Sequence, residues 1–257
     1  MNVYTFKSRE PDHGPRPPAG EPMFNLPRVI IWLGAILIGI HGVRSFVLPA
    51  GIDLDLLLYF GFWPVRYTTG VFASGMAPGG LAADIWSFVT YSFLHGGTMH
   101  VVFNVLWMAI FGTAVARRFG AGRFLLLSAL CAIAGALTHL MTHFGESVPV
   151  IGASAAVSGQ MAAAIRFIFE YGGPLGSFRR SDAGAYFMPA VSLRQSFSNP
   201  QVITFTAVWF GLNLFMGLAS APMAGEGTSI AWQAHIGGFI AGLLLFPVLD
   251  PVSRRRG

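Results

Sequence analysis

The chain has 257 residues, of which 54% are hydrophobic and only 11% are charged, and its mean hydropathy is +0.61. A soluble globular domain carries about 25% charged residues, so this composition indicates a membrane protein and excludes a disordered chain or a nucleic-acid-binding arm. The single cysteine excludes a scaffold of internal disulfides.

Residues 1–27 are polar and rich in proline, and they lack the apolar run of a cleavable signal, so we expect a flexible cytoplasmic tail. From Val29 to about Pro49 the chain is almost entirely apolar and reaches the length of about 20 residues that a transmembrane helix needs. Further apolar segments bring the expected number of spans to six: 98–116, 122–143, 151–170, 201–221 and 229–249.

Two connections between the predicted spans are long. Residues 50–97 form an outer loop that is too hydrophobic for a plain loop, so Leu56–Trp63 and Ile85–Phe93 should lie in or on the membrane interface. Within it, Asp53 and Asp55 are alternative partners for Arg44, which otherwise anchors the end of the first span. Residues 171–200 are rich in Gly, Ser and Arg, which predicts a flexible cytoplasmic loop.

The basic residues predict the orientation of the chain. All 16 Lys and Arg residues except Arg44 and Arg66 fall on one side of the six spans. Because basic residues concentrate in cytoplasmic segments, both termini should be cytoplasmic. The net charge of +5 is then a topology signal, and no nucleic-acid partner is implied. The predicted fold is an all-α membrane protein with a six-helix domain at 28–250 and a basic cytoplasmic tail at 251–257.

Three predicted spans carry polar side chains near their starts, where such groups are costly in a bilayer and indicate function. The second opens with HGGTMHVVFN, which contains His95, His100 and Asn104; the fourth has GASAAVSG, with Ser154; the sixth has AHIGGFIAG, with His235. All three spans run from outside to inside in this topology. Their polar residues should therefore share one depth, about 5–10 Å below the outer surface.

This combination of side chains favours hydrolysis. A serine hydroxyl needs a base to take its proton, and histidine is the usual base near neutral pH. His100 and Asn104 are four residues apart, so both face one side of their helix, where each can donate a hydrogen bond to a developing oxyanion. Glycines in spans four and six would let these helices approach closely. Each of these groups alone equally suits a contact between helices, so their coincidence is what favours a catalytic site.

A metal centre is the alternative at His139 and His143, which are also four residues apart. No HExxH arrangement accompanies them, so we interpret them as interfacial histidines and expect no metal or cofactor.

The motifs closely resemble those of the rhomboid intramembrane serine proteases. The run from His95 to Asn104, the Gly-x-Ser at 152–154 and the AHxxGxxxG at 234–242 occur in the family's order. The resemblance covers about residues 28–250.

The resemblance implies a role for each motif residue. Ser154 would be the nucleophile and His235 the general base of a Ser–His dyad, while His100 and Asn104 would stabilise the oxyanion. It also implies a mobile cap at 219–230 and a lateral gate in the fifth span. The expected gate and cap residues are Phe205, Trp209, Phe210 and Met223.

The sequence departs from the family pattern at two positions. Ala155 follows the serine where glycine is usual, and Ser87 follows Trp86 where arginine is frequent. Ala155 begins a small-residue helical face, so we expect alanine to be tolerated, with Gly237 or Gly238 offering room for its methyl group.

The implied function is that of a serine endopeptidase in a bacterial inner membrane, which cleaves single-span proteins in or next to their transmembrane segments. Its partners would be these substrates and membrane lipids. One alternative is an inactive rhomboid-like protein that binds transmembrane helices as a chaperone or adaptor; the intact Ser154 and His235 count against it. A small transporter is the other, and it is opposed by the absence of internal repeats and of paired acidic residues in the spans.

Overall fold

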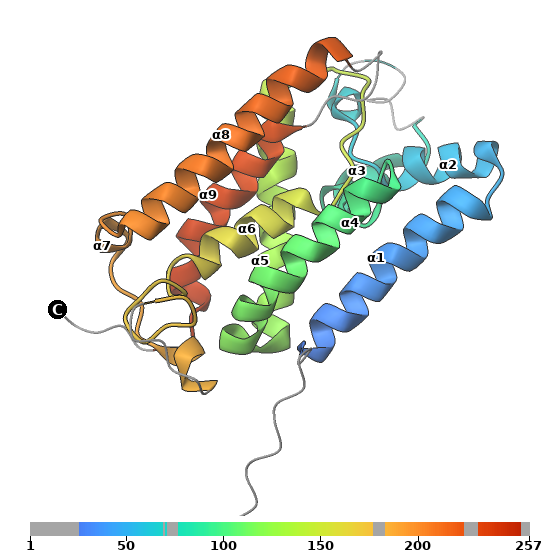
Figure 1. Cartoon of the computed structure of the whole chain (residues 1–257). Coiled ribbons are helices and arrows are strands. Elements are labelled where there is room, and N and C mark those ends of the chain that lie inside the picture. Colours follow the sequence, from blue (N-terminus) through green and yellow to red (C-terminus); the bar gives the residue numbers. More distant parts are fainter. Residues whose placement is uncertain (1–25, 69, 71–76, 177–182, 224–230, 253–257) are drawn as a thin grey trace, which may run out of the picture.

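The computed structural model describes residues 26–68, 70, 77–176, 183–223 and 231–252, and side chains in the fifth long apolar segment up to Gly217 (Figure 1). The regular structure of these residues is helical; the only β-type pairing among them is an isolated bridge between Phe62 and Val150. The longer helices are α1 (Arg28–Phe46), α2 (Ala50–Phe60), α3 (Gly80–Thr90), α4 (Thr98–Trp107), α5 (Thr113–Thr142), α6 (Ser154–Ala164), α8 (Pro200–Met223) and α9 (Trp232–Leu249). The short ones are η1 (Pro64–Tyr67), η3 (Tyr91–Phe93), the π-helix η4 (Met108–Gly112), η5 (Ala183–Phe187) and α7 (Leu193–Ser196).

Three helical segments in the described ranges are long and apolar enough to cross a membrane: Arg28–Phe46, Thr98–Thr142 and Trp232–Leu249. The second is 45 residues long because α4, η4 and α5 follow one another directly. Gly120 has a φ of 75° inside α5, so the backbone leaves helical geometry there and two helical parts result. The predicted all-helical membrane protein is confirmed, while the six spans and their orientation stay predictions.

Helix α6 lies in the middle of the bundle, between α9 and α4, with α5 behind it in the view of Figure 1. Every residue from Ala155 to Ala164 is buried. Most of its side chains are small, so neighbouring helices can approach it closely. The helix is shorter than the predicted span at 151–170, because after Ala164 the chain forms turns in which Arg166 donates to the carbonyl of Val191 at 2.7 Å.

Helices α6 and α9 touch through their backbones. A methyl group added to Gly238 would meet the backbone of Ala155, and one added to Gly242 would meet that of Gly159. No larger residue fits at either position without moving a helix. The small residues of the fourth and sixth apolar segments therefore produce the close approach that the sequence predicts.

The outer segment 50–97 is organised by one buried arginine. The guanidinium of Arg66 donates to Asp84 Oδ1 at 3.0 Å and to the carbonyls of Leu58 and Pro78 at 2.6 and 2.7 Å. A buried guanidinium is costly unless its donors are paired. These bonds therefore tie α2, η1 and α3 into one unit.

A second arginine fixes this unit to α1. Arg44 binds Asp53 with Nε and Nη2, at 2.6 and 3.2 Å, and its Nη1 donates to the carbonyl of His95 at 3.2 Å. Of the two aspartates considered above, Asp53 is thus the partner. The chain that enters α4 is held in place by the same guanidinium.

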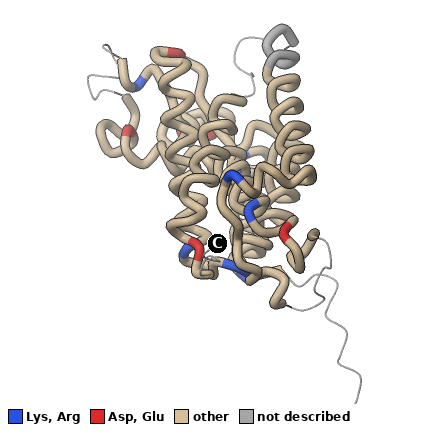
Figure 2. The backbone as a smooth tube through the Cα atoms, turned by 90° about the vertical axis from the view of Figure 1, so that its left-hand side faces the viewer, with Lys and Arg blue, Asp and Glu red and all other residues tan. Residues whose placement is uncertain are grey.

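At the opposite end of the bundle, a buried ion pair holds the segment between α6 and α8. Arg118 binds both carboxylate oxygens of Asp250, at 2.7 and 2.8 Å, and donates to the carbonyls of Tyr186 and Met188, both at 2.8 Å. The middle of the predicted flexible loop is therefore held against the bundle, with Ala185 buried. Figure 2 shows most Lys and Arg positions in this half of the molecule.

Candidate active site

The turn that leads into α6 is fastened to the outer segment. Phe62 and Val150 exchange two backbone hydrogen bonds of 3.1 and 2.8 Å, and the N–H of Gly152 donates to the carbonyl of Tyr91 at 3.0 Å. The Tyr91 hydroxyl in turn donates to the carbonyl of Ala132 in α5 at 2.9 Å. Residues 150–153 are therefore placed by contacts on two sides before α6 begins.

Gly152 brings this turn against the pair of polar side chains on α4. Its φ is +116°, and a Cβ atom added to it would lie 2.5 Å from His100 Nε2 and 3.7 Å from Asn104 Nδ2. Only glycine suits both the backbone angle and the space. His100 and Asn104 therefore lie beside the residue two positions before Ser154.

Ser154 is the first residue of α6 and is half-buried. The first turn of a helix has unpaired N–H groups and the positive end of the helix dipole, both of which favour developing negative charge. Ala155, the residue that replaces the family's usual glycine, is helical and buried. A methyl group at Gly135 of α5 would lie 2.5 Å from the Ala155 Cβ atom, so Gly135 provides the space for that methyl. Gly238, one of the two glycines considered for this role, lies against the backbone of Ala155 on the α9 side.

His235 lies in the first turn of α9 and is half-buried. Gly238, almost one turn further along α9, abuts Ala155, so the packing brings His235 to the end of α6 that carries Ser154. Within the described residues, His235 bonds Asn213 through Nδ1 at 2.5 Å and forms no hydrogen bond with Ser154. Catalytic hydrogen bonds are often long before substrate binds.

Asn104 and His100 on α4 are held in place by their own helix and by the chain that precedes it. Asn104 is buried, and its Nδ2 donates to the carbonyl of His100 at 3.0 Å. The ring of His95 packs edge-on against that of His100 with centroids 5.0 Å apart. Of the sequence-predicted residues, His100, Asn104, Ser154 and His235 thus come from three elements that meet around Gly152 and Ala155.

The residues expected at the gate lie on α8. Phe205 packs on Phe111 with ring centroids 5.2 Å apart, and Trp209 stacks on Phe239 of α9 at 4.3 Å. Phe210 is exposed on the same helix. Met223 is the last residue of α8, but its side chain lies outside the described residues, as do residues 224–230 of the expected cap.

Sequence reasoning missed Asn213. It lies on α8 and is the hydrogen-bond partner of His235. The sequence does indicate a role for Asn213, because a single amide in the apolar run VWFGLNLFMG is costly in a membrane and needs a hydrogen-bond partner.

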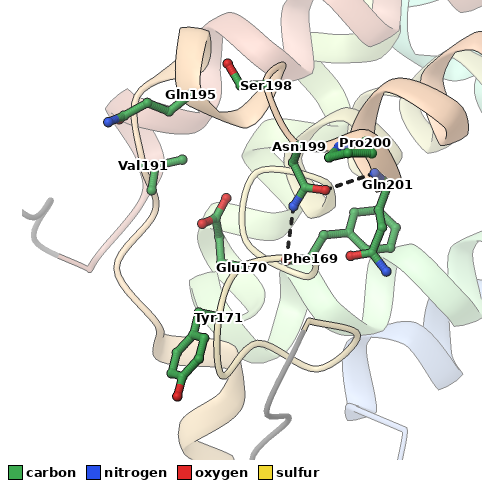
Figure 3. A pocket seen from close by; sticks show the side chains of 9 residues that line it. All are labelled: Phe169, Glu170, Tyr171, Val191, Gln195, Ser198, Asn199, Pro200 and Gln201. Atoms are coloured by element: carbon green, nitrogen blue, oxygen red, sulfur yellow. Dashed lines mark hydrogen bonds between the residues drawn. The ribbon is translucent and has the colours of Figure 1, made fainter.

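Two other features lie apart from these residues. A cavity of about 570 Å³ opens at the far end of α6 from Ser154, between the chain that follows α6 and the start of α8 (Figure 3).

The rings of His139 and His143 stack with centroids 4.2 Å apart, and the described residues contain no group of three or more metal-ligating side chains.

Comparison with known proteins gives the family. The Rhomboid domain model matches residues 82–250. The chain belongs to the rhomboid family. The rhomboid proteases GlpG of Salmonella paratyphi A, Salmonella newport and Salmonella typhi are each 25% identical to it over 176 residues, which are 68% of this chain and 52% of each relative.

This rhomboid protein is an integral membrane protein, as its family and its apolar helices indicate. The matched region contains the segments with His95, His100 and Asn104, with Ser154, and with His235. The chain spans about half the length of the curated relatives it matches.

Proposed function

We propose that this rhomboid protein is an intramembrane serine endopeptidase that cleaves transmembrane segments of membrane proteins. The observation that carries the proposal is the meeting of three elements at one place. Gly152, two residues before Ser154, contacts His100 and Asn104, and Gly238 of the His235 helix contacts Ala155, the residue after Ser154.

In the proposed reaction, Ser154 Oγ attacks the carbonyl carbon of the scissile peptide while His235 Nε2 takes the hydroxyl proton. The carbonyl oxygen becomes an oxyanion, to which His100 and Asn104 donate hydrogen bonds. His235 then protonates the leaving amide nitrogen and the C–N bond breaks. Water, with its proton taken by His235, hydrolyses the acyl-enzyme and restores Ser154.

Cleavage of a transmembrane segment requires its helix to unwind. Carbonyl groups of a stable transmembrane helix are bonded within the helix, so the substrate must unwind before Ser154 can reach one. Substrates with small residues at the scissile position and helix-destabilising residues nearby are therefore favoured. We propose that the site opens toward the outer face of a bacterial inner membrane and that substrate enters beside α8.

Ala155 is the departure from the family pattern that bears on the alternative of an inactive, helix-binding relative. Its methyl group fits against Gly135 within a regular helix, so the substitution offers no physical reason for inactivity.

The test is cleavage of a single-span reporter substrate co-reconstituted with the purified protein in liposomes. We expect wild-type protein to release two fragments, and Ser154→Ala and His235→Ala to release none. Ser158→Ala, a serine one turn deeper in α6, is the matched control and should cleave like wild type. Equal cleavage by wild type and Ser154→Ala would contradict the proposal.

A further inference from the structure

Helices α8 and α9 are antiparallel and meet at three successive levels. A methyl group added to Gly217 would meet the ring of Trp232, Asn213 bonds His235, and Trp209 stacks on Phe239 with an interplanar angle of 19°. The polar contact is the middle one, with a close contact about one turn away on either side. The Asn213 side chain is therefore held opposite His235 by the packing of the two helices.

The orientation of the Asn213 amide is determined by its own helix. Its Nδ2 donates to the carbonyl of Trp209 at 2.8 Å, which leaves Oδ1 facing His235 Nδ1 at 2.5 Å. The flipped amide would place Oδ1 against the Trp209 carbonyl, two acceptors in contact. Oδ1 has no proton, so Nδ1 of His235 must be the donor.

The tautomer of a neutral histidine follows from this bond. When Nδ1 carries the proton, Nε2 has the lone pair and is the basic nitrogen. The general base proposed above needs this form, because the nitrogen that faces the serine must accept its proton.

We infer that Asn213 is a positioning residue of the active site, which orients the imidazole of His235, fixes its Nδ1–H tautomer and so makes a Ser–His–Asn arrangement from α6, α9 and α8. The inference rests on the proposed function. Asn213 contributes an acceptor to His235 and, within the part of the chain that the structure describes, forms no hydrogen bond with Ser154.

The experiment compares full-length wild type with Asn213→Leu, which removes the acceptor at similar volume, and Asn213→Asp, which keeps an acceptor oxygen. Thr206→Val is the matched control: the Thr206 hydroxyl is buried on the same helix and has no hydrogen-bond partner within the described residues. The first readout is the rate of covalent labelling by a small fluorophosphonate probe, which needs no lateral gate. The second is ¹⁵N NMR of histidine-labelled protein, with the His235 signals assigned by their loss in His235→Ala.

We expect Asn213→Leu to label about tenfold more slowly, as the loss of one hydrogen bond implies, and to lose the pure Nδ1–H signature of His235. Asn213→Asp should label within about threefold of wild type, and Thr206→Val should match it. Wild-type labelling by Asn213→Leu, or slow labelling with an unchanged tautomer, would overturn the inference alone. A wild type that labels no faster than Ser154→Ala would contradict the proposed function itself.

Discussion

At the scale of single residues, Gly152 is under two constraints at once. Its φ of +116° is unfavourable for any other L-residue, and its Cα faces His100 with no room for a methyl group. The glycine of the Gly-x-Ser motif is thus required by packing as well as by any catalytic role, because the turn can lie against α4 only if this residue has no side chain.

We therefore predict that Gly152→Ala lowers both cleavage and thermal stability. The backbone strain is about 1–2 kcal/mol, and the methyl group would displace His100 from the site. Gly39→Ala is the control, because the methyl added on α1 would have no atom within 4 Å beyond its chain neighbours and the backbone of its own helix. The measurement is the melting temperature and specific activity in one detergent. Equal values for Gly152→Ala and Gly39→Ala would refute this account of the turn.

Asn104 is expected to act on the transition state. Removal of one oxyanion donor costs about 10²–10³ in kcat in a well-studied soluble protease, so Asn104→Ala should lower kcat and leave KM nearly unchanged. Steady-state kinetics with the single-span reporter substrate provide the check. If Asn104→Ala cleaved the substrate at the wild-type rate, Asn104 would have only a structural role, through its bond to the His100 carbonyl.

At the scale of helices, the contact between α5 and α6 depends on one glycine and one methyl group. We predict that Gly135→Ala destabilises the protein by about 1–3 kcal/mol, because the new Cβ would collide with that of Ala155.

Ala155→Gly alone should change cleavage by less than about tenfold and lower the melting temperature slightly, since alanine is the better helix former.

The double variant Gly135→Ala/Ala155→Gly isolates this contact. It should be more stable than Gly135→Ala alone, though less stable than wild type because the Ala234 carbonyl also lies 2.8 Å from the new methyl. Thermal unfolding of the four proteins measures the coupling. Strictly additive effects would show that Gly135 is not the space that the Ala155 methyl needs.

These helices also show what a sequence can and cannot predict. The motif positions and the glycines of the α6–α9 contact could be predicted from the sequence, because the spacing of residues along a helix determines which of them share a face. The end of α6 at Ala164 could not be predicted, since a buried turn and a buried helix have the same apolar composition. The pairing of Asn213 with His235, and the Gly135 space for Ala155, depend on which helices become neighbours, and no local pattern encodes that.

At the scale of the whole molecule, the two ends of the bundle differ in charge and in construction. The segment 50–97 is held by Arg44 and Arg66. Most basic residues of the described chain lie in the half of the molecule that holds the Arg118–Asp250 pair (Figure 2). The orientation we propose follows from this asymmetry, with the basic end in the cytoplasm.

The orientation is tested by cysteine accessibility, which the chain's single cysteine, buried Cys131, makes simple. In a Cys131→Ala background, we predict that Glu146→Cys reacts with an impermeant maleimide in intact bacterial spheroplasts. Arg194→Cys should react only after permeabilisation, because it lies on the opposite side. Both native residues are exposed, so access to the reagent is not limited by the fold. The reverse labelling pattern would invert the proposed topology.

The central claim is that Ser154 is a nucleophile activated by His235 within the membrane. Its most direct test is mass spectrometry of the purified, detergent-solubilised chain after reaction with a fluorophosphonate probe. The account predicts one adduct, on Ser154, that is absent from Ser154→Ala and greatly reduced in His235→Ala, while Ser158→Ala reacts as wild type. An unreacted Ser154 in folded wild-type protein, or labelling that persists in His235→Ala at the wild-type rate, would contradict it.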